Sequence, residues 1–332
     1  MKVSIADITA KMTDALKAKG YTDSDIPFLI EMYLGGELRG HTSHGLASFP
    51  GFVKEDYSGL EQPEVIKETH AFFMLDAKGN PGAIVGKRAA DEAMQRAKQE
   101  VVGISMIKDM DSWLRPGAIA QYVADQGFAV IVSNNASAAT APPGGFDPVA
   151  GTNPIAYGLP TKDGALVVDM ATAKYAWGNV RLANKYGTDL PAESFYDDKG
   201  NVTLDPAQAW SVMPFGAYKG FALALLFEAL CGGLNGMDML VENTAKNKFG
   251  QKTPRRGAFI LVIDPAQTVG LDAFKQANSE YIQKIKATRP RKGERIRIPG
   301  DESAAVQSAK LKEGSIEVPD GVWKEIQGLS WQ

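Results

Sequence analysis

The segment Arg39-Gly-His-Thr-Ser-His-Gly45 contains two of the three histidines of the chain, His41 and His44, within a short polar stretch. A histidine titrates near neutral pH, so it can donate the proton that a carbonyl oxygen needs when a hydride arrives on the carbon. Ser43 beside His44 can orient the imidazole or a substrate oxygen. A capped or core histidine in a loop would look the same in sequence, so this alternative stays open.

No familiar nucleotide or metal motif accompanies these histidines. A Gly-x-Gly-x-x-Gly turn between a strand and a helix is absent, and so are a Walker loop, zinc-ligand spacings and a nucleophile elbow. Gly79-Asn-Pro-Gly82 precedes a predicted helix, but Pro81 has no amide hydrogen, and we interpret the segment as an ordinary turn. A bound nucleotide would therefore need other backbone and polar groups.

The elements that must position the histidine segment begin with two helices. A capping box at Ser4 starts the first, Gly20 ends its pattern, and a second runs from about residue 25 to 38 directly into the segment. From residue 71 the pattern alternates between strands and helices. The predicted strands lie at 71–75, 101–107, 129–132, 165–169 and 258–264, and the helices at 82–98, 117–124 and, as a buried helix, 218–234.

Composition limits the class of protein. The 332 residues are 44% hydrophobic, enough for one large or two smaller domains, and the net charge of -3 is dispersed, which argues against nucleic-acid binding and favours a small-molecule substrate. The single cysteine, Cys231, excludes an internal disulfide and is expected to be buried. Without a long apolar segment, we expect a cytoplasmic protein with no membrane partner.

A basic run at 284–297 carries seven Lys and Arg residues around one acid, Glu294. Such runs are usually solvated faces, and we favour that interpretation here.

Glycine, proline and polar residues also gather in segments that are long for ordinary loops. These segments and the residues beside them contain a series of short motifs. In order, the motifs are Ser43-His-Gly-Leu46 with Phe49-Pro50, Gly144-Gly145, Gly151-Thr-Asn-Pro154, Val168-Asp-Met-Ala-Thr172, Asp197-Asp-Lys-Gly200, Lys219-Gly220, and Ile296-Arg-Ile-Pro-Gly-Asp-Glu302 with Val322-Trp323. In this order and spacing the chain resembles, over nearly its whole length, the malate/L-lactate (L-2-hydroxycarboxylate) dehydrogenase family. The tail is most similar to the diketogulonate reductases of that family.

The resemblance implies an α/β fold of the non-Rossmann L-2-hydroxycarboxylate dehydrogenase type, with a central mixed sheet and a helical domain formed by the two termini. Residues 1–70 with 285–332 would form the helical, dimerisation and substrate domain. Residues 71–284 would form the nicotinamide cofactor-binding domain. Family members are homodimers, and apolar anchors such as Val318, Val322, Trp323 and Ile326 suggest that the termini contribute to the interface.

The activity that the resemblance implies is reduction of a 2-oxo acid, or oxidation of the 2-hydroxy acid, with NAD or NADP as hydride carrier. His44 would be the proton donor, assisted by Ser43, and Asp197 its acidic partner, although an aspartate there is also ordinary turn chemistry. Lys219 would bind a phosphate, and no metal is expected. The cofactor-binding positions implied are Val168, Asp169, Met170, Ala171, Thr172, Lys219, Gly220, Gly300, Asp301 and Glu302.

Two departures concern the substrate. Ser48 stands where many relatives have an arginine suited to a carboxylate, and Asp111-Ser112 stands where many have Asn-His. Arg115 matches an arginine of the diketogulonate reductases and would take over the carboxylate contact, although a surface arginine that caps a helix fits equally. Ser48, Asp111, Ser112 and Arg115 are thus the predicted substrate-binding residues.

Two alternatives remain open. The negative charge of Asp111 would favour a cationic substrate, as in a reductase of cyclic imines of the Δ1-piperideine- or pyrroline-2-carboxylate type. The chain would otherwise be a non-catalytic nucleotide-binding descendant, against which the retained Ser43, His44 and Asp197 argue.

Overall fold

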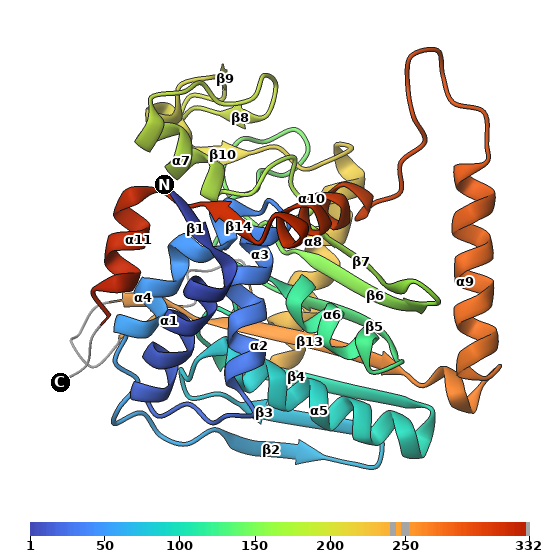
Figure 1. Ribbon diagram of the computed structural model, residues 1–332. Coiled ribbons are helices and arrows are strands. Elements are labelled where there is room, and N and C mark those ends of the chain that lie inside the picture. Colours follow the sequence, from blue (N-terminus) through green and yellow to red (C-terminus); the bar gives the residue numbers. More distant parts are fainter. Residues whose placement is uncertain (240–243, 247–251, 330–332) are drawn as a thin grey trace. The chain divides into compact units, whose positions relative to one another are not determined.

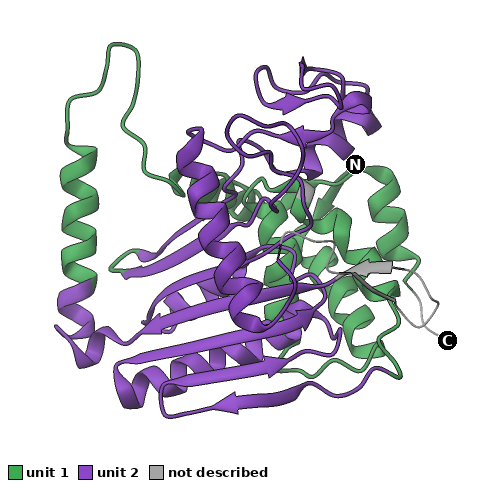
Figure 2. Cartoon of the chain, turned by 180° about the vertical axis from the view of Figure 1, so that it is seen from behind, with its two compact units in different colours: residues 1–59, 161–163, 275–332 green, residues 60–160, 164–274 purple. Residues whose placement is uncertain are grey.

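The computed structural model describes residues 1–239, 244–246 and 252–329. The chain divides into two compact units (Figure 2). Unit 1 comprises residues 1–59, 161–163 and 275–332, and unit 2 comprises residues 60–160 and 164–274. The sequence places these divisions after residues 70 and 284, and the roles that it assigns to the two parts stay predictions.

Unit 2 is built on a seven-stranded sheet. The strand order is β2 (Glu64–Glu68), β3 (Phe72–Asp76), β4 (Val102–Met110), β13 (Arg256–Ile263), β5 (Ala129–Asn134), β6 (Ile155–Thr161) and β7 (Gly164–Met170). β3 and β4 are parallel, whereas β13 is antiparallel to both of its neighbours. The predicted mixed sheet is therefore confirmed.

Helices cover both faces of this sheet. α5 (Gly82–Glu100) and α6 (Pro116–Asp125) lie on one face and α8 (Tyr218–Cys231) on the other (Figures 1 and 2). The alanine-rich side of α5 allows close approach, because a Cβ on Gly103 of β4 would lie 1.9 Å from the carbonyl oxygen of Ala93. Cys231 is fully buried as predicted, and burial raises the pKa of its thiol to about 12.

The strand directions bring several chain segments to one edge of the sheet. β4, β5 and β7 end there, and β13 and β6 begin there, since β13 runs against β4 and β5, and β6 against β5. The loop that follows β4 is therefore a direct neighbour of the first residue of β13, whereas β7 lies three strands away from β13 in the same sheet. Asp111 follows β4, Arg256 is the first residue of β13, and residues 168–172 span the end of β7.

A small lobe of unit 2 carries the remaining strands. β8 (Phe195–Tyr196) pairs with β9 (Val202–Thr203) and β10 (Ser211–Val212), and α7 (Gly178–Tyr186) packs beside them. Val180, Phe195 and Val212 are buried in its core with Trp177 against them. Separately, β11 (Thr244–Lys246) pairs with β12 (Lys252–Pro254).

Unit 1 joins the two ends of the chain. β1 (Lys2–Ser4) pairs antiparallel with β14 (Ser315–Glu317), so the two terminal segments are joined in this unit. The helices are α1 (Ile5–Ala18), α2 (Ile26–Ile30), α3 (Gly36–Leu38), α4 (Phe49–Lys54), α9 (Leu271–Lys286), of which residues 275–286 belong here, α10 (Asp301–Glu313) and α11 (Asp320–Gln327). The Ser4 hydroxyl accepts a hydrogen bond from the Asp7 amide at 3.1 Å, as the capping box predicts.

Three differences from the sequence predictions stand out. The outer side of α8 is exposed, with Leu225 and Leu226 at 47% and 49%, so the prediction of a buried helix was wrong for this side. A continuous apolar run does not reveal which side of a helix is covered. A π-helical turn at Glu31–Gly35 divides the second helix, and the exposed strand β2 was not predicted at all.

Two further observations concern surfaces. Val318, Trp323 and Ile326, predicted as interface anchors, are buried in the structure. In the described ranges, no helix is both long enough and apolar enough to cross a membrane.

Candidate active site

His44 ends a short 3-10 helix, Thr42–His44, in unit 1. Its side chain is half-buried, and its backbone N–H donates to the His41 carbonyl at 3.1 Å. His41 is exposed, with its Nε2 3.4 Å from the Ser303 hydroxyl. The side chain of Ser43 lies outside the described part of the chain. Ser48 is half-buried and precedes α4.

A buried carboxylate lies beneath this segment. Glu37 accepts a hydrogen bond from the Leu46 amide at 3.3 Å, and Lys310 donates to the Glu37 carbonyl at 2.7 Å. Burial raises the pKa of Glu37, while the Leu46 N–H and the charge of Lys310 act in the opposite direction. A Cβ on Gly45 would lie 2.6 Å from Glu37 Oε2, so this packing explains the glycine that follows His44.

The other predicted residues of unit 1 lie at the start of α10. Asp301 accepts hydrogen bonds from Lys286 Nζ at 2.9 Å and from the Ile298 amide at 3.1 Å. Partial burial acts to raise the pKa of Asp301, but these partners together lower it. Glu302 pairs with Arg297 at 2.5 Å, and Gly300 has a φ of 93°. The acids partly neutralise the exposed basic run, which fits a solvated face.

In unit 2 the two predicted cofactor segments touch each other. The Thr172 amide and hydroxyl both donate to the Thr152 carbonyl at 2.9 Å. A Cβ on Gly220 would lie 2.5 Å from the Thr172 carbonyl oxygen, so residues 168–172 pack directly against the first turn of α8. Lys219 on that turn is exposed, as are Met170 and, partly, Ala171, whereas Val168 is buried.

Asp169 is held at the start of α6, within the electrostatic influence of Arg115. Asp169 Oδ2 accepts a hydrogen bond from the Gly117 amide, in the first turn of α6, at 3.0 Å. Burial raises the pKa of Asp169, while the charge of Arg115 and the Gly117 N–H oppose that rise. Arg115 is itself only 6% exposed at the N-cap of α6, so it is not a surface arginine.

Asp111 and Ser112 follow β4 directly. The loop packs against Gly82, where a Cβ would lie 2.3 Å from the Asp111 carbonyl oxygen. Gly82 was predicted as the end of a turn and the start of a helix, and the structure shows that it lets the loop approach α5. The Ser112 hydroxyl accepts a hydrogen bond from the Leu114 amide at 3.0 Å, and buried Trp113 donates to Asn134 at 2.7 Å. The loop is thus firmly held.

Arg256 is a charged neighbour of this loop that the sequence analysis missed. Its Nη1 lies 4.0 Å from Asp111 Oδ1, and the side chains of Arg256 and Asp111 are 21% and 34% exposed. Burial lowers the pKa of Arg256, and Asp111 acts against this. The signal in the sequence was the pair Arg255-Arg256 immediately before an apolar strand.

A buried polar network, also missed, anchors α8. Glu228 accepts hydrogen bonds from Asn135 Nδ2 at 3.1 Å and Asn153 Nδ2 at 2.9 Å. The sign of this network in the sequence was Glu228, a single acid in an otherwise apolar helix. The network fixes the loop that contains Thr152, on which Thr172 depends.

Asp197 closes the turn between β8 and β9 in unit 2. Its Oδ1 accepts the Lys199 and Asn201 amides at 2.9 and 2.8 Å, and its Oδ2 accepts the Asn201 side chain at 3.1 Å. The hydrogen bond from the Asn201 side chain is the main cause of a lowered pKa of Asp197. The turn function accounts for these contacts, and the role beside His44 stays a prediction.

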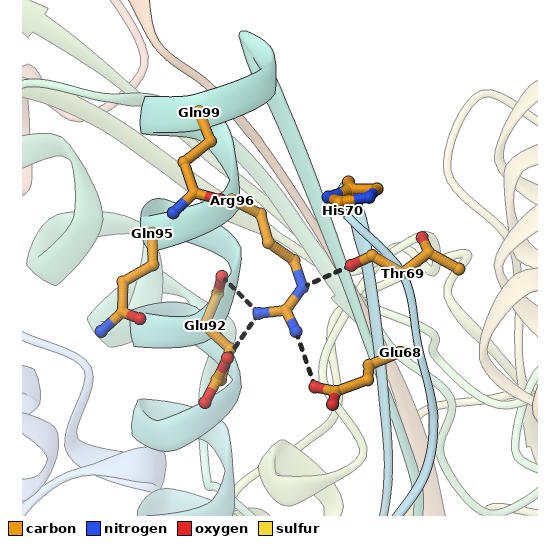
Figure 3. A pocket seen from close by; sticks show the side chains of 7 residues that line it. All are labelled: Glu68, Thr69, His70, Glu92, Gln95, Arg96 and Gln99. Atoms are coloured by element: carbon orange, nitrogen blue, oxygen red, sulfur yellow. Dashed lines mark hydrogen bonds and ion pairs between the residues drawn. The ribbon is translucent and has the colours of Figure 1, made fainter.

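A hollow between α5 and the end of β2 contains none of the predicted site residues (Figure 3). Arg96 fills its centre and binds the Thr69 carbonyl at 3.3 Å and Glu68 at 3.1 Å, together with Glu92. The seven lining residues are Glu68, Thr69, His70, Glu92, Gln95, Arg96 and Gln99. We interpret this hollow as a structural clamp. In the described residues, no three His, Cys, Asp or Glu side chains are placed to hold a metal.

Comparison with known proteins identifies the family. The family model for malate/L-lactate dehydrogenase matches residues 3–327. The chain belongs to the malate/L-lactate dehydrogenase family. It is therefore an oxidoreductase, in a family of dehydrogenases that generally use a nicotinamide cofactor.

Relatives with different substrates resemble this family member. Malate/(S)-sulfolactate dehydrogenase of Methanothermus fervidus is 30% identical over 90% of this chain and 88% of its own. 2,3-Diketo-L-gulonate reductase of Shigella boydii is 26% identical over 99% and 100%. The crystal structure of Δ1-piperideine-2-carboxylate reductase from Pseudomonas syringae matches with a TM-score of 0.84, at 26% identity over 99% and 100%.

Proposed function

We propose that this dehydrogenase reduces a 2-oxo acid to the 2-hydroxy acid with NADH or NADPH, and catalyses the reverse oxidation. The observation that carries the proposal is His44, half-buried on a turn fixed by Glu37 and Gly45, in a chain whose relatives are named for 2-hydroxy and 2-oxo acids. Such a histidine can give its proton to the carbonyl oxygen.

The predicted cofactor residues of unit 2 suit a dinucleotide. Lys219 offers an exposed ammonium group on the first turn of a 14-residue helix, where the helix dipole also favours a phosphate. Residues 168–172 pack against that turn and would line the same site. When bound, the nicotinamide supplies the hydride. His44 supplies the proton, and Ser43 is predicted to orient the substrate oxygen.

The substrate would carry a carboxylate. Asp111, which alone would favour a cationic imine, has Arg256 within 4.0 Å, and this positive charge weakens the attraction for a cation. We therefore favour the 2-oxo acid. A cyclic imine carboxylate is the second candidate, because the Δ1-piperideine-2-carboxylate reductase shares the fold over the whole chain.

We also propose that the protein is a homodimer. Its support is the exposed apolar side of α8, where Leu225 and Leu226 adjoin Ala222 and Ala229, and where the only acid of the helix, Glu228, points inward. Apolar helix faces of this kind are usually covered by a partner. The apolar side chains near the C-terminus are instead largely used within the chain itself.

The test of the activity is oxidation of NADH and NADPH in the presence of pyruvate, oxaloacetate, 2,3-diketogulonate or Δ1-piperideine-2-carboxylate. We expect turnover with at least one of the oxo acids. Turnover with the imine alone would support the second candidate. No oxidation with any of the four would contradict both and indicate a non-catalytic descendant.

A further inference from the structure

Arg256 stands at a distinctive point of the sheet. It is the first residue of the central strand β13 and lies opposite Met110, the last residue of β4. The strand register shifts between Arg256 and Ala258, and a Cβ on Gly257 would lie 1.7 Å from the Cys231 carbonyl oxygen. Such irregularities bend a strand and redirect a side chain, often next to active sites.

The contact of Arg256 with Asp111 is too long to satisfy its guanidinium group. A charge-assisted hydrogen bond between nitrogen and oxygen measures about 2.7–2.9 Å, whereas the shortest Arg256–Asp111 distance is 4.0 Å. Among the described residues, Asp111 is the one acid in an ion pair with Arg256. The planar fork of donors therefore remains able to bind a further carboxylate in two-point geometry.

Arg115 is the residue that the sequence analysis considered for the carboxylate contact, but its surroundings differ from those of Arg256. It is 6% exposed and its charge acts on Asp169, which also receives the Gly117 amide at the start of α6. A guanidinium so placed compensates a half-buried acid of its own chain. Arg256 is more exposed and more loosely paired, and it borders Asp111 in the predicted substrate-binding loop.

We propose that Arg256 binds the anionic group of the substrate, the contact for which the sequence analysis considered Arg115. The inference rests on the proposed 2-oxo acid reductase activity. Asp111 holds the guanidinium loosely in position, and the incoming carboxylate takes up its free donors. No bond is made or broken in this step, and Arg256 acts on binding rather than on proton transfer.

Binding of oxamate, an analogue of pyruvate that accepts no hydride, tests this without turnover. Calorimetry would compare wild type in the presence of NADH or NADPH with Arg256→Met, Arg256→Lys and Arg181→Met. Arg181 is an exposed arginine of α7 and serves as the matched control. We expect Arg256→Met to weaken oxamate binding by about ten- to a hundred-fold, the effect of losing a charged hydrogen bond. Lysine should recover part of the loss, and Arg181→Met should change nothing.

The KM values for pyruvate and oxaloacetate then locate the anionic group. Equal increases in Arg256→Met indicate the carboxylate next to the carbonyl, and an increase for oxaloacetate alone indicates the second carboxylate; both support the proposal. Unchanged oxamate affinity and KM values in Arg256→Met would overturn it. If Arg256→Met does not fold, Asp111→Asn decides: freeing Arg256 should lower the KM for oxaloacetate, and a higher KM would overturn the proposal.

Failure of the two proposals can be told apart. A wild-type protein that reduces no oxo acid disproves the proposed activity. A wild-type protein that reduces oxo acids, with kinetics that the Arg256 variants leave intact, disproves only this inference.

Discussion

At the level of single residues, the most consequential charges are those of Arg115 and Asp169. Removing Arg115 leaves a carboxylate that burial already destabilises, so Arg115→Met should cost about 3 kcal/mol of unfolding free energy. The double variant Arg115→Met with Asp169→Asn should recover most of this loss. Thermal unfolding of the three proteins provides the measurement, and equal midpoints for the single variant and wild type would refute the coupling.

The stability that Arg115→Met loses should depend on pH, and the direction follows from the sign of the pKa shift of Asp169. The pKa of Asp169 is raised in the folded state, chiefly by burial, so folding becomes less favourable as pH rises above the ordinary aspartate range. Without Arg115 the pKa should rise further. The stability difference between Arg115→Met and wild type should therefore be larger at pH 8 than at pH 5, and a difference that grows toward acid pH would contradict this.

Asp197 allows its two predicted roles to be separated. An asparagine can still accept the Lys199 and Asn201 amides, so Asp197→Asn should keep the turn while it removes the charge. If the carboxylate tunes His44, its loss should move the pKa that governs kcat/KM to lower pH, because a nearby negative charge stabilises the imidazolium. An unchanged pH profile with an unchanged unfolding midpoint would leave Asp197 as a turn residue only.

At the level of elements, the turn that carries His44 depends on Gly45. A methyl group there would meet Glu37 Oε2 at 2.6 Å, so Gly45→Ala should displace the turn, cost about 1–3 kcal/mol and lower kcat on the order of ten-fold or more. Gly51→Ala in α4 is the control, since a Cβ there has nothing within 4 Å, and alanine should stabilise the helix slightly. Wild-type kinetics in Gly45→Ala would contradict the assigned packing.

Elements with strong periodicity were predictable from the sequence. Helices α1, α5 and α6 and strands β3, β4, β5, β7 and β13 lie where their patterns indicated, within a few residues. β2 was not predictable because all of its five residues are exposed and three are charged, so it has no buried face to produce an alternation. The exposed side of α8 escaped prediction because exposure depends on the neighbours of a helix rather than on its own composition.

The candidate site was predictable where local motifs define it and not where distant segments meet. The histidine segment and residues 168–172 stand out by composition or family resemblance. Three features of the site join residues that are separated in the sequence by 8 to 145 positions. They are the effect of Arg115 on Asp169, the approach of Arg256 to Asp111, and the carboxylate of Glu37 under Gly45. The order of strands brings Arg256 to Asp111, and the folding of the chain brings the members of the other two pairs near each other. Single-sequence patterns contain neither kind of information.

At the level of the whole molecule, the assembly should depend on α8. Replacing Leu225 and Leu226 with glutamate places two charges on the proposed interface, so the variant should sediment as a monomer at micromolar concentration. Val269→Glu is the control, because Val269 is 67% exposed outside this face. A double variant that remains dimeric, or a wild type that is monomeric, would contradict the proposed interface.

The most direct test of the proposed chemistry is single-turnover reduction by His44→Ala, with His41→Asn as the control three residues away. With saturating NADH or NADPH and the best oxo acid substrate, the rate of hydride transfer in His44→Ala should fall by a factor on the order of 10²–10⁴. Cofactor affinity should be nearly unchanged, and His41→Asn should react like wild type. A wild-type rate in His44→Ala would contradict its assignment as the proton donor.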